Sequence, residues 1–131
     1  MTTACVDPIL VPDFWPHVRE FVRSAMDRCE LGSFGHVERA VLEGEYLLWV
    51  HSTDQQSIDG ALVTSLILTD AGKVCFIVAF SGHRAMMQDL AMIEAFARAE
   101  GCVSIRLHGR KGWQRILPNY QLKAVVLERS L

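Results

Sequence analysis

The sequence has no strong excess of charge of either sign and no long apolar run. Its formal net charge is −2 over 131 residues, so it lacks the dense positive charge that attracts nucleic acid or anionic membranes. No apolar stretch approaches the roughly 20 residues that span a bilayer. Residues 1–5 have neither the basic start nor the apolar run of a signal peptide. We therefore expect a cytoplasmic protein with no membrane partner and no specific nucleic-acid partner.

The sequence also lacks a metal-binding or redox motif. Its four cysteines are far apart and none forms a C-x-x-C pair, which argues against a zinc knuckle or a redox site. The outlying histidines His17, His36 and His51 are not spaced to place two metal ligands on one helix face. We predict no metal site and expect the thiols to be reduced and buried.

The apolar pattern predicts one domain over residues 1–131, with 50% hydrophobic residues and no linker or repeat. A first helix is expected from Pro16, and a second is expected to start at Ser33 and stop at Gly44. Strands are expected at 46–51 and 58–68, with a bulge at Gly60. Trp15 and Trp49 have the character of core residues or interface anchors.

A strand, helix and strand follow between residues 73 and 107. Residues 74–80 are almost continuously apolar, which predicts a strand covered on both faces. A helix face formed by Met86, Leu90, Ile93 and Ala97 then leads to Gly101 and a strand at 103–107. Such a crossover is parallel, and open sheets of this type bind ligands beyond the carboxyl ends of their strands. We expect the site near residues 81–85 and 108–113, before a short helix at 112–118 and a last strand at 122–128.

This order of elements resembles the GNAT-type N-acetyltransferase fold, a mixed-sheet α/β (α+β) fold. Two N-terminal helices, antiparallel strands, a parallel strand–helix–strand crossover, a short helix and a final strand make up the expected domain. A sharper similarity is to small GNAT-like proteins of phages and prophages, which share a Gly-Cys pair and a Gly-Arg-x-Gly-Trp motif. Here these are Gly101-Cys102 and Gly109-Arg110-Lys111-Gly112-Trp113. That resemblance implies a phage-encoded protein, in the host cytoplasm or in the virion.

The resemblance implies a coenzyme loop with the pattern Q/R-x-x-G-x-G/A, in which backbone N–H groups at a helix N-terminus hold the pyrophosphate of acyl-CoA. The corresponding residues begin with Ser81, Gly82, His83, Arg84 and Ala85. Gly82 falls at the Gln/Arg position and Ala85 at the first glycine. Met87 falls at the second Gly/Ala position, where its side chain covers the amides or turns into the core. We therefore expect a degenerate loop and no cofactor, with acetyl-CoA as the cofactor if the protein is an enzyme.

The resemblance also implies a tyrosine that protonates the departing thiolate and a carboxylate or water that accepts the amine proton. The tyrosine position falls near Leu117, and Tyr120 is the nearby candidate, with packing as its alternative role. The expected fourth strand has no carboxylate. Glu45 and Asp59 flank earlier strands and reach a substrate only if their loops fold inward.

Two further features concern the crevice between the crossover strands. His83 and Arg84 follow one strand, and His108, Arg110 and Lys111 follow the other. Together they predict a positive site for an anion or an acidic partner, although charges in such positions are often only solvated. Trp113 is either an interface residue or the anchor that packs the last short helix on the sheet.

Three classes of function remain open. The first is a phage virion or assembly protein with a degenerate acetyltransferase site, which acts through contact with another protein or with its own copy. Its interface anchors are then Phe14, Trp15 and Trp49, some of them exposed in the monomer. The second is an acyl-CoA-dependent N-acyltransferase acting on an amine. The third is a small anion- or nucleotide-binding regulator that uses the same crevice.

Overall fold

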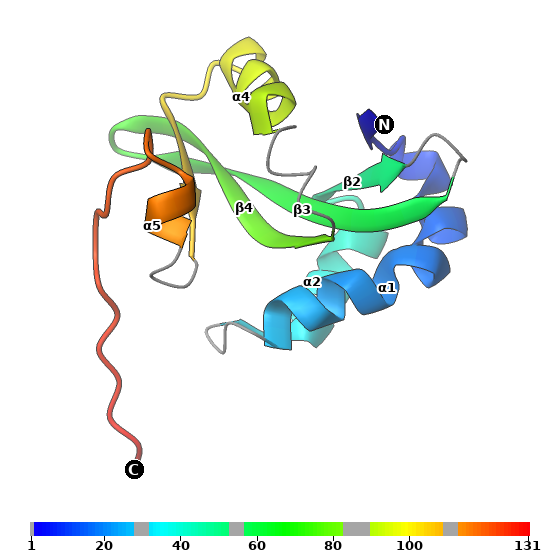
Figure 1. Cartoon of the computed structure of the whole chain (residues 1–131), viewed down its shortest axis with the longest axis horizontal. Coiled ribbons are helices and arrows are strands. Elements are labelled where there is room, and N and C mark those ends of the chain that lie inside the picture. The colour runs from blue at the N-terminus through cyan, green and yellow to red at the C-terminus, as the bar shows by residue number, and fades with distance from the viewer. Residues whose placement is uncertain (1, 28–31, 53–56, 83–89, 109–112) are drawn as a thin grey trace.

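The computed structural model describes residues 2–27, 32–52, 57–82, 90–108 and 113–131. It contains a five-stranded sheet in the order β1-β2-β3-β4-β5, with helices on both faces (Figure 1). The elements are β1 (Thr2–Cys5), η1 (Pro8–Leu10), α1 (Val11–Asp27), α2 (Phe34–Leu42), β2 (Leu47–Ser52), β3 (Ile58–Thr69), β4 (Gly72–Gly82), α4 (Leu90–Ala99), β5 (Ser104–Leu107) and α5 (Trp113–Ile116). The first four strands are antiparallel and the β4–β5 pair is parallel, which confirms the predicted mixed α/β sheet and its crossover.

One face of the sheet is covered by α1 and α2 (Figure 1). Val18, Val22 and Val41 are fully buried against this face, where they meet Val63 of β3. The predicted cap is confirmed, because the Ser33 hydroxyl accepts a hydrogen bond of 3.4 Å from the backbone N–H at the start of α2. Each of the two helices buries an apolar stripe on the sheet, and this packing stabilises the helices.

The start of α1 differs from the prediction. The helix begins at Val11 and contains Pro16 in its interior, instead of starting near that proline. Pro16 lacks the N–H that would bond to the carbonyl of Pro12, one turn earlier. The burial of Val11 and Trp15 on the same face favours the extra turn and offsets the lost bond.

The opposite face carries α4, which buries Leu90, Ile93 and Ala97 as the sequence spacing predicted. Trp49 projects from β2 into this second core and stacks edge to face on Phe96, with ring centroids 5.2 Å apart. Met86 lies outside the described residues. The two cores lie on opposite faces of the sheet.

The strand β1 is a second departure, because the prediction placed two helices before any strand. It pairs with β2 along residues 2–5, and Cys5 within it is exposed, contrary to the expected burial of all thiols. The pairing is supported by Thr3, whose hydroxyl lies 3.1 Å from Nδ1 of the fully buried His51. The His51 Nε2 atom lies 3.5 Å from Asp59 Oδ1 on β3, so this polar cluster ties three strands together.

Glycines set two turns that the fold needs. Gly101 has φ of 78° after the end of α4, the left-handed conformation predicted for it. Gly72 has φ of 129° in the β3–β4 turn, and a Cβ there would lie 2.9 Å from Val103 Cγ1. Gly101 turns the chain from α4 toward β5, and Gly72 lets the β3–β4 turn pass close to Val103.

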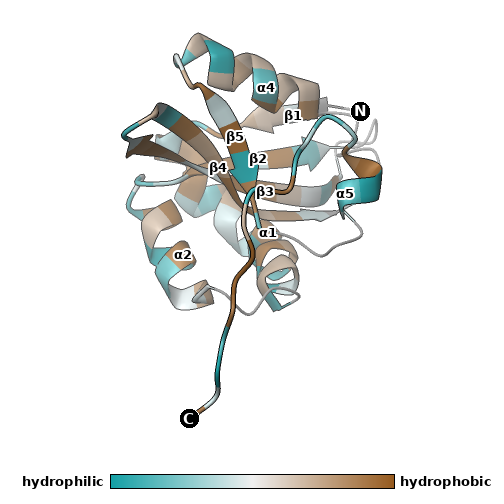
Figure 2. Ribbon diagram, turned by 90° about the vertical axis from the view of Figure 1, so that its left-hand side faces the viewer, coloured by the Kyte–Doolittle hydropathy of each residue, from teal (hydrophilic) through white to brown (hydrophobic). Residues whose placement is uncertain are grey.

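The last expected strand does not form. Residues 117–131 contain no helix or strand, and residues 121–131 are exposed along their length. Figure 2 shows the apolar end of the chain extending away from the domain. Its β-branched and apolar residues suit a strand, but no described strand pairs with them, so the pattern alone did not decide the outcome.

Candidate functional site

The parallel pairing of β4 with β5 ends before β4 does, and a pocket lies beside the unpaired part of β4. Their register runs from Val74 opposite Ser104 to Ile77 opposite Leu107, whereas β4 continues to Gly82. Beyond Ile77, the edge of β4 that faces β5 has no strand partner among the described residues. A pocket of about 310 Å³ opens beside it.

The shape of β4 directs side chains into this pocket. The β3–β4 register shifts between Val63 and Thr64, so Val78 is an extra residue in β4 with no partner on β3. Such a bulge bends the strand and turns its side chains. Residues 76–80 form one wall, and the opposite walls come from the ends of α1 and α2 and from β5 and α5.

A polar group from α2 stands at the rim of the pocket. His36 and Tyr46 both line it, with Tyr46 Oη 3.4 Å from His36 Nε2. Arg39 Nη2 lies 3.3 Å from His36 Nδ1, and Arg39 also pairs with Glu43 at 2.6 Å and with Glu45 at 3.7 Å. Glu45 thus binds an arginine at the rim rather than reaching into the pocket.

The contact with Arg39 favours one tautomer of a neutral His36 ring. Arginine has only donors, so the Nδ1 atom of His36 must accept. The proton of the neutral ring is then on Nε2, which donates to Tyr46 Oη. The hydroxyl proton of Tyr46 remains available to an acceptor in the pocket.

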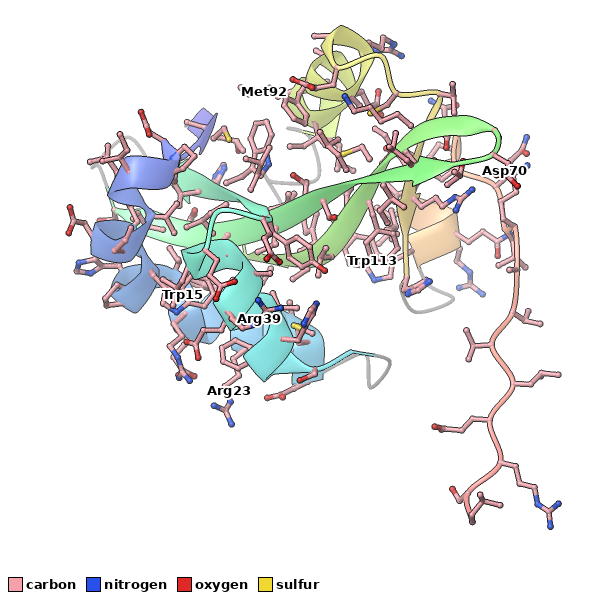
Figure 3. The ribbon with its side chains drawn as sticks, turned by 180° about the vertical axis from the view of Figure 1, so that it is seen from behind. Trp15, Arg23, Arg39, Asp70, Met92 and Trp113 are labelled. Atoms are coloured by element: carbon pink, nitrogen blue, oxygen red, sulfur yellow. The ribbon has the colours of Figure 1, made fainter. Side chains whose placement is uncertain are left out.

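The two described residues of the predicted C-terminal cluster also line the pocket. Trp113 stacks edge to face on Phe80, with centroids 5.5 Å apart, and Figure 3 shows it at the base of α5 beside the sheet. His108 stacks on Phe76 at 5.0 Å and is exposed at the pocket edge. That the functional site lies near residues 108–113 stays a prediction, whereas Trp113 packs as the anchor of its helix.

Tyr120 lies in a different place. Its hydroxyl donates to Glu94 Oε2 over 3.2 Å, and it lines a smaller pocket of about 170 Å³ beside α4. Burial, and then the Glu94 carboxylate, raise the pKa of Tyr120 to about 12. The geometry matches the packing role considered for this residue, because Tyr120 is not among the residues that line the larger pocket.

The remaining predicted residues are only partly described. Ser81 and Gly82 end β4 opposite Ala61 and Gly60. The rest of the coenzyme loop, with His83, Arg84, Ala85 and Met87, and the motif residues Gly109, Arg110, Lys111 and Gly112 lie outside the described residues. The degenerate loop and the positive cluster therefore stay predictions.

Sequence reasoning missed the polar group at the rim. His36, Arg39 and Glu43 are spaced by three and four residues, which places them on one face of a helix. That Tyr46 returns to the same face depends on the turn at Gly44, where φ is 79°. The helical spacing of His36, Arg39 and Glu43 was visible in the sequence, whereas the position of Tyr46 beside them was not.

Neither a metal site nor a membrane helix is found in the described part of the chain. No three His, Cys, Asp or Glu side chains there are grouped to hold a metal ion. No helix among the same residues is long and apolar enough to cross a bilayer.

Comparison with known proteins places this fold among acetyltransferases. No protein-family model and no curated protein matches the sequence. Among solved structures, a probable acetyltransferase superposes with a TM-score of 0.70 at 12% identity, covering 100% of this chain and 97% of the other. An aminoglycoside acetyltransferase from an uncultured soil metagenomic sample, in complex with sisomicin, has a TM-score of 0.70 at 10% identity, covering 99% and 95%. A predicted acetyltransferase from Clostridium acetobutylicum, with acetyl-CoA, has a TM-score of 0.62 at 12% identity, covering 99% and 94%.

At these identities the likeness shows the fold, which is the GNAT-type fold that the order of elements predicted. None of these three structures is named as a phage or virion protein, so the expectation of a virion or assembly role gains no support from them. The Gly-Arg-x-Gly-Trp motif as a mark of phage proteins likewise stays a prediction.

Proposed function

We propose that this protein is an acyl-CoA-dependent N-acyltransferase that acts on a small amine. The observation that carries the proposal is the pocket of about 310 Å³ beside the part of β4 that extends beyond the end of β5. The pocket has the unpaired edge of β4 along one wall, and the Tyr46 hydroxyl and the His36 imidazole stand at its rim. The three neighbours named above are described as acetyltransferases, and one of them holds acetyl-CoA.

The unpaired edge of β4 fits the coenzyme arm. Backbone groups of Val78, Ala79 and Phe80 have no strand partner on the side of β5 among the described residues. An extended ligand with amide groups, as in the pantetheine arm, can bind such an edge in the way that a peptide adds to a sheet. The coenzyme supplies the activated acyl group as a thioester.

Two side chains suit the proton transfers of the reaction. As the amine nitrogen bonds to the acyl carbon, the carbon–sulfur bond breaks, the sulfur gains a proton and the nitrogen loses one. Tyr46 is placed to donate, because its oxygen already accepts from His36 and its own proton is available. His108 at the pocket edge is placed to accept the proton of the amine.

The test is a thiol-release assay with acetyl-CoA and a panel of amines that includes aminoglycosides, polyamines and peptide N-termini. We expect Tyr46→Phe to lower kcat by about 100-fold, the usual size of a lost acid–base residue. Tyr120→Phe is the matched control, and we expect it to keep near wild-type kcat. His108→Gln should lower kcat, whereas His17→Gln, at an exposed position on α1, should not.

Coenzyme binding is measured separately, by calorimetry, because the expected loop departs from the family pattern at Met87. Failure of acetyl-CoA to bind at millimolar concentration, with no turnover of any amine, would refute the enzyme and favour the degenerate site. Loss of activity in Tyr120→Phe but not in Tyr46→Phe would keep the enzyme and restore Tyr120 as the proton donor.

A further inference from the structure

The end of the chain is a β-strand sequence without a strand partner. Leu122, Val125, Val126 and Leu127 are 69%, 71%, 60% and 90% exposed. Four of the seven residues 122–128 are valine or leucine, and three of these form one unbroken run at 125–127, which favours an extended strand. Figure 3 shows the end of the chain extending from the domain with no helix or strand beside it. We refer to residues 122–128 as the terminal segment.

The sheet has an unpaired edge at β5 to which such a strand can add. β5 pairs with β4 on one side, and the sheet order places no described strand on its other side. Ile105 and Leu107 of β5 are half-buried against the α4 core. An exposed edge of this kind binds an added strand through its free N–H and C=O groups.

The terminal segment is held away from the β5 edge of its own chain. Tyr120 anchors the chain just before the segment, through its hydrogen bond to Glu94 and its packing against the α4 core. From this point the chain runs out past the domain instead of turning back along β5 (Figures 1 and 2). The free strand and the free edge therefore occur in one molecule but do not meet.

We propose that two copies of this chain exchange their terminal segments, each adding a strand to the β5 edge of the other. The two requirements of a reciprocal exchange, an outgoing strand and a vacant edge, are both present in every copy, so a closed two-fold dimer satisfies both at once. In Figure 2 the segment and β5 both run away from α4. A two-fold axis normal to the sheet reverses that direction, so the partner's segment lies antiparallel to β5, and both copies lose their exposed edge.

The oligomeric state tests the proposal through two matched substitutions. Leu127 and Ile9 are exposed to similar extents, 90% and 84%, and Ile9 lies in η1 far from β5 (Figure 1). By sedimentation velocity we expect a dimer for the full chain. Leu127→Lys should raise the dimer dissociation constant at least about tenfold, whereas Ile9→Lys should leave it within about twofold. Circular dichroism should show both variants folded, because neither side chain is buried in the isolated chain.

Cross-linking tests which chain fills the edge. Directly opposed residues in neighbouring strands lie close enough for a disulfide, so Arg106→Cys is combined with Val125→Cys or with Val126→Cys. Oxidation should give a covalent dimer from at least one pair, whereas Arg106→Cys alone controls for the natural cysteines. A monomer at about 100 μM, equal effects of the two lysine substitutions, or disulfides formed only within one chain would each overturn the exchange.

Discussion

The hydrogen bond between Trp49 and Thr64 offers a direct test of the core on the α4 side. Trp49 Nε1 donates to Thr64 Oγ1 over 3.0 Å, and the two residues are 4% and 0% exposed. Thr64→Val keeps the shape of the side chain but leaves the buried indole N–H without an acceptor, which costs about 1–3 kcal/mol. Trp49→Phe removes the donor and part of the ring, with a loss of similar size or larger.

The double variant separates the bond from the packing. Because Trp49→Phe with Thr64→Val leaves no unpaired donor, we expect the loss of stability to be smaller than the sum of the single losses by about 1–2 kcal/mol. Urea denaturation followed by circular dichroism measures all four proteins. The exposed pair Arg39 and Glu43 serves as the control cycle and should couple by only about 0.3–0.5 kcal/mol. Strict additivity at Trp49 and Thr64 would refute the buried bond.

Three further outcomes are expected. Hydrogen bonding to Arg19 lowers the pKa of Glu38 below 4.5. The ionised Glu38 carboxylate therefore stabilises the folded state fully above pH 4.5, and this contribution is lost as the pH falls through the lowered pKa. In Glu38→Gln, the urea midpoint should fall less steeply below about pH 5. Gly72→Ala should destabilise by roughly 1–3 kcal/mol because φ is 129°, whereas Gly35→Ala within α2, where the nearest atom is 3.9 Å away, should stabilise by up to about 1 kcal/mol in the same denaturation assay. Ultraviolet titration should show a tyrosine that ionises at about pH 12 and is missing from Tyr120→Phe, and a titration unchanged by that substitution would contradict the buried bond to Glu94.

Local chemistry in the sequence determined much of the fold. The spacing of Leu90, Ile93 and Ala97 fixed the buried face of α4, because residues three and four apart share one side of a helix. The bulge expected at Gly60 corresponds to the irregular pairing between His51 and Ser52, where Asp59 is the extra residue. These features depend on neighbours within a few residues, so the sequence was sufficient.

Features that depend on distant neighbours were predicted wrongly or missed. The strand β1 has only four residues and forms because β2 offers an edge and Thr3 reaches the buried His51. Trp15 and Trp49, for which the sequence left open a core or an interface role, are both in the core, since Trp15 donates to Glu38 and Trp49 to Thr64. Indole groups can be fully buried only where such acceptors stand, and those acceptors are 15 to 23 residues away in the sequence.

The same distinction applies to the site and to the end of the chain. The sequence was sufficient to predict the parallel crossover, and two of the residues it placed beyond the strand ends, His108 and Trp113, line the pocket. Only the tertiary structure decided that β5 stops at Leu107 while β4 continues, and that the turn at Gly44 brings Tyr46 to His36. It also decided that a strand-forming sequence at 122–128 stays unpaired, because a strand requires a partner edge in space, and residue preferences along the chain cannot supply one.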